Sequence, residues 1–123
     1  MNESYKQCVY WREPEKIREG SKRFEKIATY IEDDHWFRRL LKCDECGQLY
    51  FYELYEWTDY EKGNDPQYRK WIPVASEDEA LKLLEKLPFE LNGYEPCLCM
   101  DWPADKGDPE IFWVRRNLAA NSV

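Results

Sequence analysis

The sequence predicts an α+β domain in which a small antiparallel sheet carries two helices packed on one face. The chain has 123 residues, which is the usual length of one domain. Segments with strand-like alternation and segments with helical spacing follow one another, joined by short loops. Short loops favour antiparallel neighbours, since parallel strands need long crossovers. No repeat or linker divides the chain, so we expect residues 1–123 to form a single domain whose tail frays from about residue 117.

The first third of the chain is predicted to form a strand, a helix and a second strand. Residues 5–11 form a short apolar segment typical of a strand. Apolar residues at helical spacing predict a helix over residues 21–32, with a face made of Phe24, Ile27, Ala28 and Ile31. Residues 35–41 then return to a strand pattern that leads directly into Cys43.

The middle of the chain carries the clearest strand pattern. Residues 48–60 are apolar on both alternating faces, which is typical of a central strand or of a contact surface. Residues 62–66 have the composition of a turn. Residues 68–74 form the returning strand, with Pro73 near its end, where a missing N–H is tolerated.

A second helix is predicted after this strand. Ser76 is a typical N-cap residue and Glu79 follows three positions later, which together make a capping box. Pro88 ends the helix, and its apolar stripe is expected to contain Ala80, Leu83, Leu84 and Leu87. The remaining segments are an irregular stretch, a loop and a final strand, at residues 94–101, 103–109 and 111–114.

The charge balance points to the kind of partner. The chain has 18 basic and 25 acidic residues, for a net charge of -7. Residues 43–66 hold seven acidic residues and one basic residue, hence -6 of that excess. Such a field attracts a basic protein and disfavours nucleic acid, whose binding depends on clustered Lys and Arg. The chain also lacks a membrane span of about 20 apolar residues and a secretory signal, so we expect a cytoplasmic protein.

The five cysteines point to a metal site. Their number is odd, and a cytoplasmic chain keeps thiols reduced, which favours metal binding over disulfides. Cys43 and Cys46 have the spacing of a metal knuckle, in which a tight turn brings two thiolates to one ion. Gly47 follows them and tolerates the positive φ that such a turn needs. This segment resembles one half of a zinc ribbon, a resemblance that implies a second pair of cysteines.

The second pair is expected from Cys97 and Cys99. They flank one residue rather than two, and fifty residues separate them from Cys46. Side chains two apart on a strand share a face, so both thiols can point at one site. The sequence therefore predicts a closed, structural Zn²⁺ site with four ligands, namely Cys43, Cys46, Cys97 and Cys99. His35 and Cys8 are reserve ligands, and four unligated, partly buried thiols are the alternative.

The sequence does not suggest an enzyme. A nucleophile needs a base beside it, and the chain has one histidine and no glycine-rich phosphate loop. We therefore expect neither catalytic residues nor a small-molecule substrate.

A protein-binding face is expected within the acidic segment, where aromatic side chains alternate with carboxylates. Aromatic residues supply contact area and carboxylates steer a basic partner, and the candidates are Tyr52, Glu53, Tyr55, Glu56, Trp57, Asp59 and Tyr60. The alternative is that the aromatic residues form the core. In size, acidity and aromatic content the chain resembles the immunity proteins of bacterial toxin–immunity pairs, which implies neutralisation of a basic nuclease toxin.

Two other functions remain open at this point. A zinc-ribbon-type module could bind nucleic acid through a basic and aromatic patch, made of Trp36, Phe37, Arg38, Arg39 and Lys42. The chain could also be a structural subunit of a larger assembly.

Overall fold

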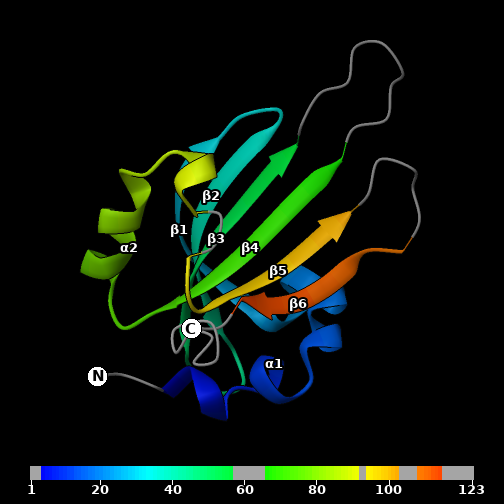
Figure 1. Cartoon of the computed structure of the whole chain (residues 1–123). Coiled ribbons are helices and arrows are strands. Elements are labelled where there is room, and N and C mark those ends of the chain that lie inside the picture. Colours follow the sequence, from blue (N-terminus) through cyan, green and yellow to red (C-terminus); the bar gives the residue numbers. More distant parts are fainter. Residues whose placement is uncertain (1–3, 57–65, 92–93, 103–107, 115–123) are drawn as a thin grey trace, which may run out of the picture.

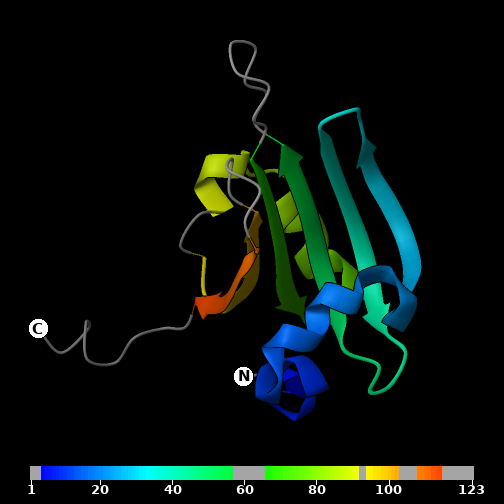
Figure 2. The same cartoon turned by 90° about the vertical axis from the view of Figure 1, so that its right-hand side faces the viewer.

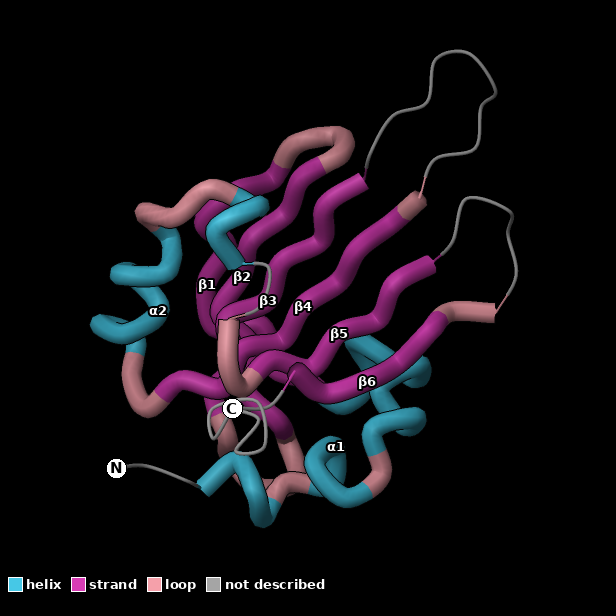
Figure 3. The backbone as a smooth tube through the Cα atoms, in the orientation of Figure 1, coloured by secondary structure: helices cyan, strands magenta, loops and turns pink. Residues whose placement is uncertain are grey.

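The computed structural model describes residues 4–56, 66–91, 94–102 and 108–114. Six strands form one antiparallel sheet in which every strand pairs with its neighbours along the chain (Figures 1 and 3). The strands are β1 (Phe24–Glu32), β2 (Trp36–Cys43), β3 (Leu49–Glu56), β4 (Gln67–Val74), β5 (Cys97–Trp102) and β6 (Glu110–Val114). The predicted antiparallel sheet is confirmed, and the expected irregular stretch before residue 102 contains the regular strand β5.

Two α-helices and three 3-10 segments surround the sheet. The N-terminal ones, η1 (Ser4–Gln7), α1 (Val9–Arg12) and η2 (Pro14–Arg23), lie against its lower end (Figure 2). The others are α2 (Glu77–Leu84) and η3 (Pro88–Leu91). The expected turn at residues 62–66, the loop after residue 102 and the tail from residue 117 fall wholly or largely outside the described residues.

Helix α2 confirms the predicted capping box. The Ser76 hydroxyl accepts a hydrogen bond from the Glu79 N–H at 3.3 Å, and the Glu79 carboxylate accepts one from the Ala75 N–H at 3.1 Å. Ala80 and Leu83 are buried, as the helical spacing predicts. The helix ends at Leu84, so the stripe does not extend to Leu87, whose residue surface is 51% exposed.

The helix predicted over residues 21–32 is wrong, because this segment forms strand β1. The pairing of β1 with β2 shifts register twice, between Lys26 and Ala28 and between Thr29 and Ile31. Each such irregularity adds a residue to one strand, so the apolar side chains no longer alternate with a strict period of two. The resulting spacing imitates that of a helix. The strand predicted over residues 5–11 is also wrong, since η1 and α1 occupy it.

The core consists of two clusters on the two faces of the sheet. On β3, Tyr50 and Tyr52 belong to the first cluster and Phe51 to the second. The N-terminal segment covers the first, which we call the N-terminal face, with Cys8, Tyr10 and Ile17. Helix α2 and η3 cover the second, the α2 face, with Ala80, Leu83 and Leu91. β3 is therefore a central strand, as predicted, whereas two helices on one face are not confirmed.

A buried ion pair lies on the α2 face. Arg38 and Glu53 are register partners on β2 and β3, and Arg38 Nε donates to Glu53 Oε2 at 2.7 Å. The Trp36 indole N–H donates to the same oxygen at 2.9 Å, and Arg38 Nη1 donates to the carbonyl of Leu84 at 3.0 Å. Because that carbonyl belongs to the last residue of α2, the pair joins the helix end to two strands.

Candidate metal centre

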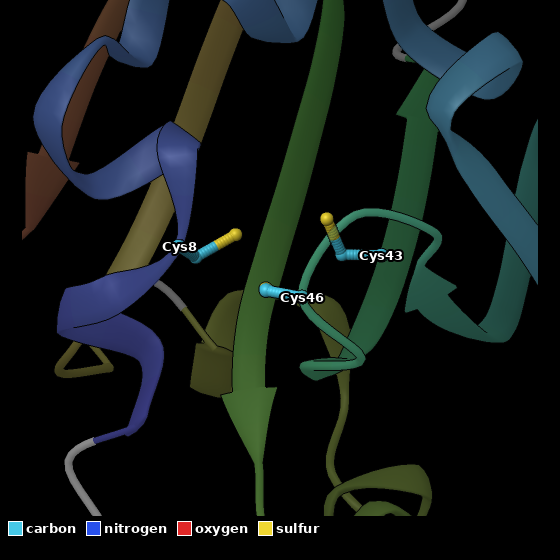
Figure 4. A group of neighbouring side chains, drawn as sticks. All are labelled: Cys8, Cys43 and Cys46. Atoms are coloured by element: carbon cyan, nitrogen blue, oxygen red, sulfur yellow. The ribbon is translucent and has the colours of Figure 1, made fainter.

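Three cysteines from separate parts of the chain converge at one end of the N-terminal face. Cys8 precedes α1, Cys43 ends β2, and Cys46 lies in the turn between β2 and β3. Their sulfur atoms all lie within 4.8 Å of one another (Figure 4). Cys8 and Cys43 are buried and Cys46 is exposed. Three sulfur ligands at this separation can hold one metal ion.

The turn between Cys43 and Gln48 has the predicted knuckle geometry. Gly47 adopts φ +82°, a conformation that glycine enters without the Cβ penalty. Its N–H donates to the Cys43 carbonyl at 2.8 Å, and the Cys43 N–H donates to the Gln48 carbonyl at 2.8 Å. These bonds fold the turn so that the Cys46 side chain returns toward Cys43. A side chain at position 47 would strain the turn.

Burial raises the pKa of two of the three thiols, those of Cys8 and Cys46, and so favours their neutral form. The pKa of Cys8 rises to about 12. Hydrogen bonds from the backbone N–H groups of Tyr10 to Cys8 and of Gln48 to Cys46 act in the opposite direction. Burial is likewise the main cause that raises the pKa of Tyr50, and the three cysteines add to it. A bound cation would supply the positive charge that thiolates need here.

Cys97 and Cys99 lie elsewhere. They share a face of β5, as the alternation predicts, but this is the α2 face, in the cluster that does not contain Cys43. Their sulfur atoms are 3.7 Å apart. The hydrogen bond from Cys97 lowers the pKa of Cys99, and Lys70, its register partner on β4, contributes. The structure thus separates the predicted ligands into two pairs, and Cys8 joins the first pair.

His35 is at the opposite end of β2 from Cys43, in the turn after β1. Its Nδ1 lies 2.6 Å from a carboxylate oxygen of Glu56. This hydrogen bond raises the pKa of His35, so the imidazole gains its charge at a higher pH than usual. Glu56 also accepts a hydrogen bond from Gln67 at 3.0 Å, and both bonds lower the pKa of its carboxyl group. His35 therefore belongs to this polar cluster rather than to the cysteines.

The expected partner-binding residues that the structure describes differ in their exposure to solvent. Tyr52 and Glu53 are buried, with 8% and 1% of their surface exposed, so a partner cannot contact them as a surface. Their strand is central, and burial on both faces of a central strand is the physical reason. Tyr55 and Glu56 are half-buried at the end of β3. Trp57, Asp59 and Tyr60 lie outside the described residues.

Comparisons with known proteins do not identify a relative. No protein family, no curated protein and no solved structure matches the chain. Within the part of the chain that the structure describes, no helix is both long enough and apolar enough to cross a membrane.

Proposed function

We propose that Cys8, Cys43 and Cys46 bind one structural Zn²⁺ ion, and that the domain held together in this way binds a basic protein without catalysing a reaction. The proximity of the three sulfur atoms, all within 4.8 Å of one another, carries the first part. Thiolates are the preferred soft ligands of zinc. Tetrahedral bonds of about 2.3 Å separate sulfur ligands by about 3.8 Å, a separation that lies within the 4.8 Å limit found here. A fourth ligand would come from outside this set.

The position of Cys8 explains what the ion would stabilise. Cys8 belongs to the N-terminal segment, whereas Cys43 and Cys46 belong to the sheet and its turn. Two residues after Cys8, Tyr10 stacks on Phe24 of β1 with ring centroids 5.3 Å apart. An ion shared by the three thiolates would therefore fasten the segment that covers the N-terminal face.

Metal analysis of single variants tests the ligand set. Protein purified without added metal should contain about one zinc per chain, and Cys8→Ser and Cys46→Ser should lose most of it. Cys97→Ser is the matched control and should keep its zinc, because Cys97 lies on the α2 face. Plasma mass spectrometry measures the content. A wild-type protein without zinc, or a loss in Cys97→Ser equal to that in Cys8→Ser, would contradict the assignment.

The second part of the proposal rests on charge. The net charge is -7, and exposed carboxylates gather where the turn after β1 lies beside the end of β3. Glu32, Asp33 and Asp34 are exposed there, and the Glu56 N–H donates to the His35 carbonyl at 2.9 Å. This acidic end suits a basic partner, and neutralisation of a nuclease toxin is the kind of function we propose for it.

Charge reversal at the acidic end tests the partner proposal. Asp34→Lys should slow association with the protein that the chain captures from its host, most strongly at low salt, because exposed charges act mainly on encounter. Glu85→Lys makes the same change of charge at the exposed C-cap of α2 and should alter the rate less. Surface interferometry at two salt concentrations gives both rates. Equal rates for the two variants, or an acidic partner, would refute the proposal.

A further inference from the structure

A cavity of about 410 Å³ opens on the N-terminal face, across strands β1 to β4. This volume lies in the range of small-molecule sites, roughly 300–1,000 Å³. Three cations and three aromatic rings line it: Lys26, Arg39, Arg69, Phe24, Tyr52 and Trp71. The described residues that line it include no carboxylate. A basic cavity is unexpected in a chain with a net charge of -7, and neither the zinc centre nor the acidic end makes use of it.

The two arginines have unused donors. Arg39 Nε and Arg69 Nε are buried and have no hydrogen-bond partner among the described residues. Because water does not reach these two atoms, an anion in the cavity would bond to the terminal nitrogens of the two side chains instead. Arg39 Nη2 does contact a carboxylate oxygen of Glu32, but at 3.4 Å and with 64% of the Glu32 side chain exposed. Such a surface pair is weak, so it leaves Arg39 available to an anion.

The aromatic residues form an adjoining wall. Arg39, Tyr52 and Trp71 are consecutive register partners across β2, β3 and β4. The rings of Tyr52 and Trp71 lie 5.2 Å apart, centroid to centroid. Burial raises the pKa of Tyr52, while Arg69 and Arg39 act on it in the opposite direction, which places both guanidinium groups near its hydroxyl. The phenol therefore stays neutral and can donate a hydrogen bond.

We propose that this cavity binds the phosphate group of a small phosphate monoester. The guanidinium forks of Arg39 and Arg69 match phosphate oxygens, and Lys26 adds a third positive charge. Three cations suit a dianionic phosphate monoester better than a single carboxylate. Tyr52 and Trp71 are 8% and 2% exposed, so their rings form the buried apolar floor of the cavity, and the three cations are the groups that recognise the ligand. This site would bind a ligand without requiring any catalytic group.

Calorimetric titration of the full chain with 5′-AMP tests the proposal. We expect saturable binding of one AMP per chain, with ribose 5-phosphate binding about as tightly and adenosine at least tenfold weaker. Arg69→Gln and Arg39→Gln should each weaken AMP binding at least tenfold. Lys42→Gln is the matched control: it removes an exposed positive charge from β2, and alternation places that charge on the opposite face from Arg39. It should bind AMP as the wild type does.

Several outcomes would overturn the proposal. These are an absence of AMP binding to the wild-type chain and equal affinity for AMP and adenosine, either of which would mean that the cations do not hold a phosphate group. An equal loss of AMP affinity in Lys42→Gln and Arg69→Gln would mean that the net charge of the chain, rather than this cavity, determines binding. Arg69→Lys keeps the charge without the planar guanidinium fork and should fall between wild type and Arg69→Gln. Amide spectra of each variant verify its fold and should show AMP shifts confined to β1–β4.

Discussion

Replacing Glu53 with alanine is expected to lower the free energy of unfolding by about 3–5 kcal/mol. Glu53 and its partner Arg38 have 1% and 0% of their side-chain surface exposed. Without the carboxylate, the guanidinium remains in the core with no counter-ion, and the Trp36 N–H loses its acceptor. Removing one member of a buried pair costs more than the pair contributes, because the remaining charge is not solvated. Urea titration at constant pH measures the change.

Two controls separate the buried charge from other effects. Glu32→Ala breaks the exposed pair with Arg39, whose atoms are 3.4 Å apart, and should cost at most about 1 kcal/mol. The double variant Arg38→Met with Glu53→Leu removes both charges and should recover much of the stability lost in Glu53→Ala. If Glu53→Ala were no more destabilising than Glu32→Ala, the charge of Arg38 would be solvated and the pair would not be buried.

This ion pair also changes the interpretation of the basic residues before the knuckle. Arg38 and Arg39 are adjacent in sequence, which suggested one nucleic-acid-binding patch with Lys42. Alternation places Arg38 on the α2 face, where it is buried, and Arg39 on the N-terminal face, where it lines the cavity. The basic residues expected to form the nucleic-acid patch therefore do not share one face of the sheet. The acidic balance of the chain argues in the same direction.

The sequence predicted the elements whose determinants are local. The cap of α2 depends on Ser76 and Glu79, three residues apart: Ser76 accepts the expected bond from the Glu79 N–H, and the Glu79 carboxylate accepts one from Ala75, the residue before the cap. The apolar character of β3 on both faces predicted a central strand, and Gly47 predicted a positive φ in the knuckle. In each case the physical cause lies within a few residues of the pattern, so the pattern suffices.

The features that the sequence did not predict depend on contacts between segments that lie far apart in the chain. Strand β1 contains two register shifts that only its pairing with β2 defines, and they gave its residues the spacing of a helix. Cys97 and Cys99 share a face as predicted, but whether that face is the one with Cys43 depends on strand order and register. Cys8 reaches the site because the N-terminal segment folds over the sheet. The cations of the cavity come from three strands and have no common spacing in the sequence.

Removal of the metal is expected to destabilise the N-terminal segment and the whole domain. Structural zinc binds model peptides with apparent free energies of roughly 10–16 kcal/mol, and that energy stabilises the fold wherever the unfolded chain lacks the site. Only part of this free energy is expected to be lost here, because the sheet also has a core that does not depend on the metal. We therefore expect a strong chelator to lower the free energy of unfolding by several kcal/mol, about the size of the Glu53 effect or more. Thermal and urea denaturation with and without chelator measure the loss.

The segments that lose hydrogen-exchange protection after zinc removal distinguish a structural ion from an adventitious one. Amide hydrogen exchange should increase first in η1 and α1, which flank Cys8, and in Phe24, which stacks on Tyr10. Strands β3 and β4 with α2 should keep their protection longest, because they also share a core on the α2 face, which the N-terminal segment does not cover. Cys97→Ser, treated in the same way, should show the same loss, and added Zn²⁺ should reverse it in both proteins. If zinc were removed completely while exchange in α1 and the denaturation midpoint stayed unchanged, the three cysteines would not hold this segment through a metal.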